Sequence, residues 1–214
     1  MKRGRTDRVA VFIDGSRAFD LADVVAEQAD LRVGARLSVD AQQRLLELDA
    51  PHRARDRALR LLALRDRSCR EMSERLRSAG YEATVVSDTI AWLRDLDYLN
   101  DSRFAAAYLS AKAKSGWGRR RIAAELALKG VERRLIDEAL EDEEETGEGG
   151  AEAMEALLSL VRRRFGKDLQ SDPDGTARRL AGFLGRRGYD WDTIRSVLRT
   201  LKDEAGAESE LTSP

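Results

Sequence analysis

The side chains best suited to chemistry in this sequence are arginines that occur in tight clusters. Arg119, Arg120 and Arg121 are consecutive, and a second group lies between Arg65 and Arg70. Guanidinium groups hold phosphate and carboxylate through paired N–H donors, and the N-terminus of a helix attracts the same anions. The clusters therefore predict contact with an anionic partner, either an acidic protein surface or nucleic-acid phosphates. Solvation of arginine-rich helix faces is the alternative interpretation.

The arginine triplet stands at the expected start of a helix. At about 100° per residue, Arg120 points nearly opposite the apolar Ile122, while Arg119 and Arg121 flank the apolar stripe. Positive charge at a helix N-terminus opposes the helix dipole and costs about 0.3 to 1 kcal/mol per charge. A role in stabilising the fold is therefore weak, and we expect the triplet to face outward. Trp117 could stack on a base, but a staple between helices is the favoured interpretation.

The composition argues against catalysis and metal binding. With one cysteine and one histidine in 214 residues, neither a disulfide framework nor a zinc site can be assembled. The sequence has no phosphate-binding loop and no nucleophile elbow, and Asp14-Gly15-Ser16 is interpreted as a turn. We therefore expect a protein without enzymatic activity, cofactor or metal ion. His52 is expected in a solvated connector.

Composition also bounds the class of protein. Hydrophobic residues make up 42% of the chain, and it has only three prolines, which favours a helical globular fold. No apolar stretch approaches the roughly 20 residues of a membrane span, and no apolar signal region follows the basic first residues. We expect a cytoplasmic protein that does not contact a membrane.

A repeated unit organises most of the chain. Gly80, Gly130 and Gly188 each follow apolar residues four and eight positions earlier, and apolar residues recur one, six and ten positions later. Such a glycine closes a helix in the left-handed conformation, and the spacing predicts a three-helix module repeated in tandem. The glycines lie 50 and 58 residues apart, and a longer loop over Gly166–Gly175 is expected to account for the difference. In the middle module, the first helix is predicted to bury Phe104, Tyr108 and Ala111.

Ahead of the repeats, the sequence predicts a small mixed domain. The runs Arg8–Ile13 and Ala18–Leu21 flank Asp14-Gly15, a strong signal for a β-hairpin. Ser38 then caps a helix that is expected to end near Leu48. We therefore expect a mainly α fold of three tandem three-helix repeats in an elongated, curved array, preceded by a small β-hairpin/α N-terminal domain. The expected boundaries are 1–50 for the N-terminal domain, 51–97, 98–143 and 151–203 for the repeats, 144–150 for an acidic glycine-rich linker and 204–214 for a disordered tail.

Three groups of residues resemble signatures of the RecX family, whose members regulate the RecA recombinase. The first is Leu64-Arg65, Arg67-Ser68, Glu71-Met72, Leu76 and Gly80. The second is Asp97–Asp101, Arg103–Ala105, Gly116, Ile122, Glu125-Leu126 and Lys129–Val131, with Asn100 where the family usually has an acid. The third is Val11–Gly15, Ala18-Phe19 and Leu31–Gly34, which resembles an N-terminal extension of some members.

The resemblance implies a regulator rather than an enzyme. Family members bind RecA, mainly as its filament on single-stranded DNA, lie in the filament groove and restrain filament growth, ATP hydrolysis and strand exchange in recombination and DNA repair. The implied partners are the RecA filament and single-stranded DNA, with double-stranded DNA as a further candidate, and the chain is expected to act as a monomer. The residues expected to contact RecA or DNA are Arg65, Arg67, Arg70, Arg103, Arg119, Arg120, Arg121, Lys129 and Arg133.

A DNA-binding transcription factor is the alternative function. Arg119–Leu140 superficially resembles a helix-turn-helix unit, in which the second helix enters the major groove. The corresponding helix here, Glu132–Leu140, is largely acidic and apolar, and the unit recurs three times. We therefore favour the regulator of RecA.

Overall fold

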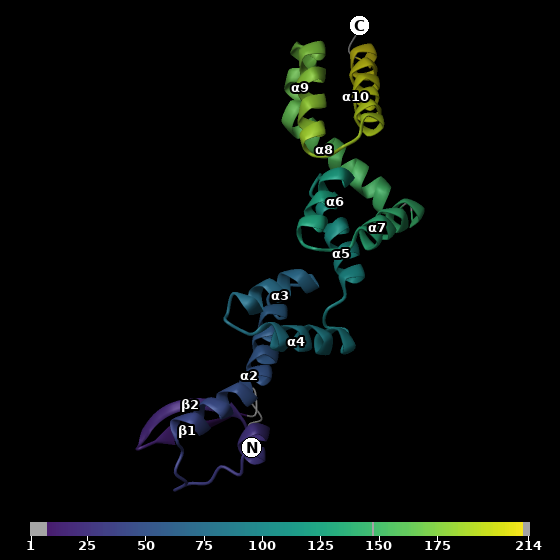
Figure 1. Cartoon of the computed structure of the whole chain (residues 1–214). Helices are drawn as coiled ribbons and strands as arrows, with labels where there is room; N and C mark the ends of the chain where they lie inside the picture. Colours follow the sequence, from purple (N-terminus) through teal and green to yellow (C-terminus); the bar gives the residue numbers. More distant parts are fainter. Residues whose placement is uncertain (1–7, 147, 212–214) are drawn as a thin grey trace. The chain divides into compact units, whose positions relative to one another are not determined.

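The chain folds into a β-hairpin followed by a series of helices in this computed structural model (Figure 1). The structure describes residues 8–146 and 148–211. The chain divides into two compact units, Met1–Asn100 and Asp101–Pro214, and each is described in turn. The basic start of the chain and the end of the expected tail, residues 1–7 and 212–214, lie outside the described residues.

The N-terminal unit begins with the predicted hairpin. Strands β1 (Arg8–Ile13) and β2 (Ser16–Ala22) pair antiparallel. Asp14 and Gly15 between them have φ values of 50° and 79°, the left-handed pair of a two-residue turn that matches the twist of the strands. Helix α1 (Asp23–Gln28) follows. The small core of this region consists of Leu21, Ala22, Val25 and Leu45.

Helix α2 (Val39–Leu62) is continuous where the sequence predicts two segments. Ser38 caps it as predicted. The expected end near Leu48 and the expected connector around His52 are wrong, because the helix continues through Pro51. A proline removes one backbone hydrogen bond and disturbs the preceding turn. Here the Arg53 guanidinium donates to the backbone carbonyl of Leu46, in the turn before Pro51, at 3.2 Å.

Asp49 of α2 ties the hairpin to this helix. Its side chain is 0% exposed. One carboxylate oxygen accepts from the backbone N–H of Ala22 at 2.8 Å, and the other pairs with Arg8 at 2.5 Å and Arg53 at 3.4 Å. A carboxylate is rarely fully buried unless hydrogen bonds and opposite charges replace its water. This network explains why α2 stays helical across the expected boundary.

The first three-helix domain packs the second half of α2 against α3 (Cys69–Arg77) and α4 (Ala83–Asp95). Ser68 and Glu71 form a capping box that starts α3. The buried core of this domain consists of Ala54, Ala58, Met72, Leu76, Val86, Leu93 and Leu99.

The C-terminal unit opens with the second three-helix domain, formed by α5 (Asp101–Lys114), α6 (Arg119–Leu128) and α7 (Arg133–Thr146). Phe104 is buried and Tyr108 packs against the core, as predicted. The prediction for Ala111 is wrong, because this side chain is exposed. The buried face of α5 is centred nearer Ala105 and Leu109, which leaves the short Ala111 at its edge.

The third domain consists of α8 (Glu148–Ser171), α9 (Pro173–Arg186) and α10 (Trp191–Leu211). The expected loop over Gly166–Gly175 is wrong, because α8 runs to Ser171. Val161, Phe165 and Leu169 keep a four-residue spacing against the core, so the apolar face of the helix passes Gly166. A longer helix, and not a longer loop, accounts for the larger interval between the repeat glycines.

Helices also occupy segments that the sequence predicts to be irregular. α7 and α8 cover residues up to Thr146 and from Glu148, where a linker is expected, and α10 continues to Leu211 through most of the expected tail. The domain boundaries themselves remain predictions. No helix in the described part is long and apolar enough to cross a membrane.

The three repeat glycines end their helices in the same way. Gly80, Gly130 and Gly188 have φ values of 87°, 79° and 88°. In each case the next residue donates its N–H to the carbonyl five positions earlier, the bond of a Schellman motif. These bonds are Tyr81 to Leu76 at 3.3 Å, Val131 to Leu126 at 3.1 Å and Tyr189 to Leu184 at 3.2 Å. The predicted repeat is therefore confirmed at the level of individual hydrogen bonds.

Candidate interaction surface

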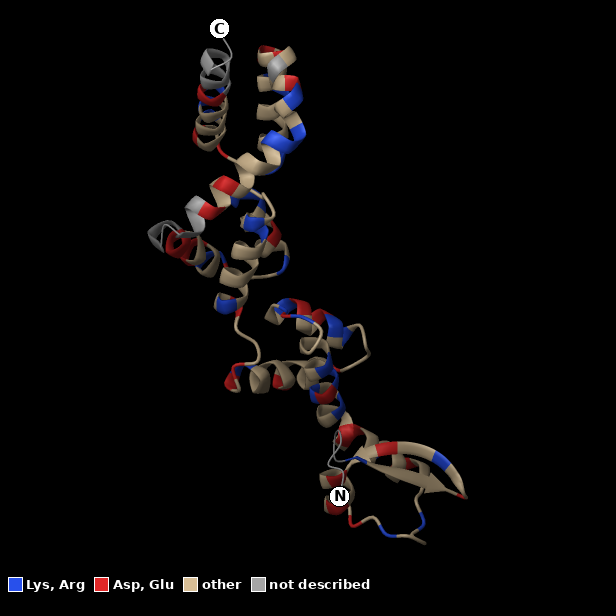
Figure 2. Cartoon of the chain, turned by 180° about the vertical axis from the view of Figure 1, so that it is seen from behind, with Lys and Arg blue, Asp and Glu red and all other residues tan. Residues whose placement is uncertain are grey.

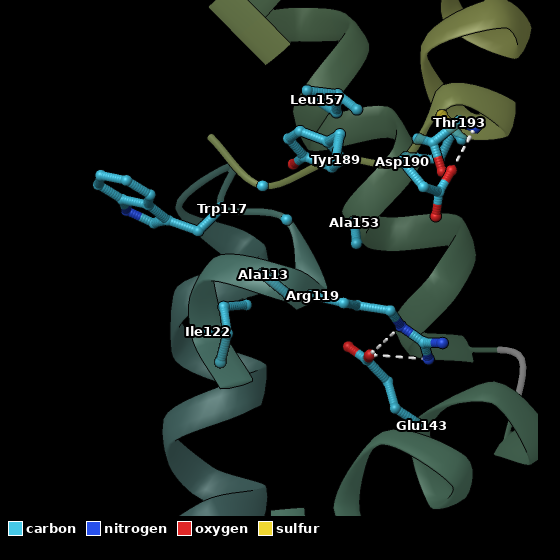
Figure 3. A pocket seen from close by; sticks show the side chains of 13 residues that line it. Ala113, Trp117, Arg119, Ile122, Glu143, Ala153, Leu157, Tyr189, Asp190 and Thr193 are labelled. Atoms are coloured by element: carbon cyan, nitrogen blue, oxygen red, sulfur yellow. Dashed lines mark hydrogen bonds and ion pairs between the residues drawn. The ribbon is translucent and has the colours of Figure 1, made fainter. Parts of the chain in front are cut away.

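The arginine triplet does not face outward as a unit. Arg119 extends toward α7, where it bonds the carboxylate of Glu143 at 3.2 Å (Figure 3). It also donates to the carbonyl of Leu140 at 2.9 Å. Arg120 and Arg121 are exposed. The prediction that the whole triplet faces outward is wrong for Arg119, because α7 supplies a carboxylate and a carbonyl at the start of α6.

The arginines of the first domain differ in the same way. Arg67 is only 8% exposed, and its Nε donates to the carbonyl of Leu61 at 3.4 Å. Burial, aided by the charge of Arg65, lowers the pKa of Arg67. Arg65 forms a two-pronged bond to Glu71, at 3.1 Å for each nitrogen, and Arg70 pairs with a glutamate one turn along α3 at 2.9 Å. Arg67 therefore stabilises the packing of the first domain, whereas Arg65 and Arg70 remain on the surface.

The other candidate residues lie in the second domain. Arg133 is 81% exposed and pairs with Asp137 at 2.9 Å. Arg103 is exposed on α5, and the Lys129 ammonium lies 5.3 Å from the ring centre of Tyr108.

The charged surface of the first unit is mixed. Positive and negative residues alternate along α2 and α3, so the surfaces of these two helices are not purely basic (Figure 2).

A cluster that sequence reasoning missed surrounds Glu125 of α6. This carboxylate accepts from the Tyr108 hydroxyl at 2.6 Å and pairs with Lys112 at 3.2 Å and Arg121 at 3.3 Å. These contacts, led by the Tyr108 hydrogen bond, hold the pKa of Glu125 below its ordinary value. Burial and the same bond raise the pKa of Tyr108. The four-residue spacings of Arg121 with Glu125 and of Tyr108 with Lys112 are the signals for this cluster in the sequence.

Trp117 joins several parts of the C-terminal unit. Its indole packs against the core of the second domain. The guanidinium carbon of Arg121 lies 3.9 Å from the ring centre, that of Arg187 lies 5.0 Å away, and the Lys112 ammonium lies 5.5 Å away. These cations come from α5, α6 and the end of α9. The favoured interpretation of Trp117 as a staple between helices agrees with these contacts.

A pocket of about 360 Å³ lies where the second and third domains meet (Figure 3). Three of its charged side chains have partners within the structure. Arg119 bonds Glu143, and Asp190 accepts from the N–H of Thr193 at 2.7 Å. Among the described residues, no group of three or more His, Cys, Asp or Glu could hold a metal ion. The pocket is therefore a packing feature of the junction between the two domains.

The pocket contains a tyrosine with an altered titration. Burial raises the pKa of Tyr189 to about 12, although the charge of Arg187 opposes the shift. A free tyrosine has a pKa of about 10, so as the pH rises the unfolded chain loses its Tyr189 proton before the folded chain does. The stabilising effect of neutral Tyr189 is therefore complete below about pH 10 and is lost as the pH approaches 12.

We expect Tyr189→Phe to weaken this alkaline dependence. Urea unfolding of the wild type should show a clear fall in the free energy of unfolding between about pH 10 and about pH 12. In the phenylalanine variant the fall should be smaller, because the group that titrates is gone. Equal falls in the two proteins would contradict the assignment of a buried, neutral Tyr189.

Comparison with known proteins shows the family. A family description, "RecX, first three-helix domain", matches residues 54–93, and the descriptions of the second and third three-helix domains match residues 100–140 and 151–198. Together they cover more than half of the chain. The chain belongs to the RecX family.

Individual RecX proteins are similar over most of their length. The chain is 31% identical over 158 residues to the regulatory protein RecX of Chlorobaculum tepidum, which covers 73% of this chain and 93% of that protein. It is 36% identical over 155 residues to the regulatory protein RecX of Halorhodospira halophila, covering 72% and 92%. A crystal structure of a regulatory protein RecX has the same fold, with a TM-score of 0.63 at 24% identity over 92% of this chain and 94% of that one. The resemblance to the RecX family seen in the sequence is therefore confirmed.

Proposed function

We propose that this chain regulates RecA by binding its filament on single-stranded DNA and restraining ATP hydrolysis, filament growth and strand exchange. The observation that carries the proposal is family membership, since the relatives bear the name regulatory protein RecX and the three family domains occur in order along the chain. In this proposal the chain acts by occupying a surface of the filament and performs no chemistry itself.

The exposed arginines support binding to a charged partner. Arg70 and Arg133 are each paired with a carboxylate one turn along their own helix. Exposed pairs of this kind contribute only about 0.3 to 0.5 kcal/mol, so a partner's carboxylates or phosphates can replace them at little cost. The proposed contact residues are therefore Arg65, Arg70, Arg103, Arg120, Arg121, Lys129 and Arg133. Arg67 and Arg119 are assigned to the fold.

The helix-turn-helix alternative gains no support from α7. Its two arginines, Arg133 and Arg134, pair with Asp137 and Glu138 of the same helix. A helix that enters the major groove lies close to the phosphates of both strands, whereas α7 is rich in carboxylates, among them Asp137, Glu138 and Glu143.

Charge reversal at three exposed contact residues tests the proposal. A variant with Arg70, Arg120 and Arg133 changed to glutamate should inhibit the DNA-dependent ATPase of RecA less strongly than the wild type. The concentration that gives half inhibition should rise at least about tenfold, which corresponds to about 1.4 kcal/mol.

The matched control reverses three exposed arginines of the third domain, Arg178, Arg195 and Arg199. It carries the same change in net charge and should inhibit almost as well as the wild type. Circular dichroism would establish that both variants are folded. Equal loss in the two variants would attribute the effect to net charge and would contradict the proposed contact surface.

A further inference from the structure

The second and third domains join through two glycine turns that cap each other. The backbone N–H of Gly118, just before α6, donates to the carbonyl of Arg187 at 2.9 Å, and the N–H of Arg120 donates to the carbonyl of Gly188 at 3.3 Å. The start of a helix has N–H groups without partners, and the end of a helix has carbonyls without partners. At this junction N–H groups at the start of α6 donate to carbonyls at the end of α9.

The two turns touch so closely that side chains cannot fit between them. A Cβ atom on Gly118 would lie 2.3 Å from the carbonyl carbon of Gly188, and a Cβ atom on Gly188 would lie 2.5 Å from the backbone nitrogen of Arg121. Both contacts are far inside van der Waals distance and involve backbone atoms, which cannot swing away. Glycine is therefore required on both sides of the junction.

This junction brings cations of both domains onto one face of the C-terminal unit. Arg187, at the end of α9, donates from Nη1 to the carbonyls of Gly116 at 2.8 Å and Ser115 at 3.3 Å. Arg121 of α6 donates in return to the carbonyl of Arg186 at 3.4 Å. Both guanidinium groups lie within 5.0 Å of the Trp117 ring centre, and the indole points away from the pocket (Figure 3).

The positive charge of this face exceeds the negative charge that neutralises it. Lys112 and Arg121 share Glu125, while the hydrogen bonds described for Arg187 go to backbone carbonyls. We call Lys112, Trp117, Arg121 and Arg187 the junction ledge. Three cations therefore stand beside one carboxylate, and a bound anion would relieve their mutual repulsion.

We propose that the junction ledge binds the phosphodiester backbone of single-stranded DNA, and that the glycine contact keeps the ledge assembled. This inference rests on the proposed function and adds to it a DNA-binding site shared by two domains. Cations grouped around an aromatic ring are typical of surfaces that hold single strands, because the cations follow the phosphates and the flat guanidinium groups of arginines accept bases of any sequence. An acidic protein segment would use the cations but would have no use for the flat surface.

The test measures binding of a fluorescently labelled oligothymidylate to the full-length chain, without RecA, by anisotropy at several salt concentrations. The variant with Lys112, Arg121 and Arg187 changed to glutamine should bind at least tenfold more weakly. Its dependence of log affinity on log salt should also be shallower by about two, since each lost phosphate contact to a single strand removes about 0.7. Unchanged affinity and an unchanged salt slope would overturn the proposal.

A substitution that adds one methyl group tests whether DNA binding depends on the assembled junction ledge or on positive charge alone. Gly118→Ala keeps every charge but separates the two turns, so it should weaken DNA binding severalfold. Gly185→Ala is its control, because a Cβ atom at this position of α9 meets nothing within 4 Å. If Gly118→Ala fails to fold, Arg187→Gln alone removes the third-domain part of the ledge and should weaken binding without disturbing the backbone. Full affinity in Arg187→Gln would refute a site shared by the two domains.

Two further outcomes keep this proposal distinct from the regulation of RecA. Polyglutamate that displaces the oligonucleotide at equal charge concentration would assign the ledge to an acidic protein and overturn the DNA assignment. A wild type that binds DNA through the ledge but leaves the RecA ATPase unchanged would support the ledge and contradict the proposed function. Ledge variants that lose DNA binding yet still inhibit RecA would leave both standing as separate properties.

Discussion

Replacing Asp49 with alanine is expected to lower the free energy of unfolding of the N-terminal unit by about 3 kcal/mol. The carboxylate is fully buried, forms ion pairs with Arg8 and Arg53, and accepts a hydrogen bond from the N–H of Ala22. Its removal takes the buried charge from Arg8 and Arg53 and leaves the N–H of Ala22 without its acceptor, and the penalty for such groups exceeds the value of the lost bonds. The hairpin should separate from α2, because this network joins the two. Urea unfolding followed by circular dichroism gives the difference.

The control for Asp49 is Asp20→Ala. Asp20 lies on β2 and pairs with Arg17 at 2.7 Å, but both side chains are exposed. The loss of such a pair should cost less than about 1 kcal/mol. A cost for Asp49→Ala no greater than that for Asp20→Ala would show that the buried network does not hold the hairpin.

Gly188→Ala should destabilise the protein far more than Gly80→Ala, although the two glycines have nearly the same conformation. Both have φ near 88°, so alanine costs about 1 to 2 kcal/mol at either position for the left-handed conformation. A Cβ atom on Gly80 meets nothing within 4 Å, whereas one on Gly188 collides with Arg121. Overpacking adds about 1 to 3 kcal/mol at the second position.

Thermal unfolding of the two glycine variants measures this difference directly. Their shared backbone penalty cancels in the comparison, so the remainder reports the contact between the second and third domains. Limited proteolysis should also cut the Gly188 variant faster near the junction, because the two domains separate more often. Equal losses of stability would mean that the domains do not depend on this contact.

The repeat could be predicted from the sequence because its signals are local. A glycine with apolar residues at fixed distances on both sides specifies a helix end and two helix faces, and Gly80, Gly130 and Gly188 carry the whole pattern. The hairpin was predictable for the same reason, since Asp14-Gly15 specifies its own turn. Continuation of α2 through Pro51 was not predictable. It depends on Asp49 meeting Arg8, which lies 41 residues earlier.

The candidate surface was predictable only in part. The clusters of arginines are visible in the sequence, but their partners are not. Arg119 pairs with a glutamate 24 residues away, and the Arg67 guanidinium turns inward to a carbonyl of α2. The ledge could not be foreseen, because Arg187 joins Trp117 from another domain. The glycines around Trp117 were the available clue, and their meaning depends on the turn that packs against them.

The most direct test of the central claim is a titration of the full-length chain into RecA assembled on single-stranded DNA, with ATP hydrolysis and filament length followed at two salt concentrations. We expect hydrolysis to fall and filaments to shorten as the chain is added, and the effect to weaken at the higher salt because exposed arginines make the contacts. Unchanged hydrolysis and unchanged filaments at both salt concentrations would contradict the account.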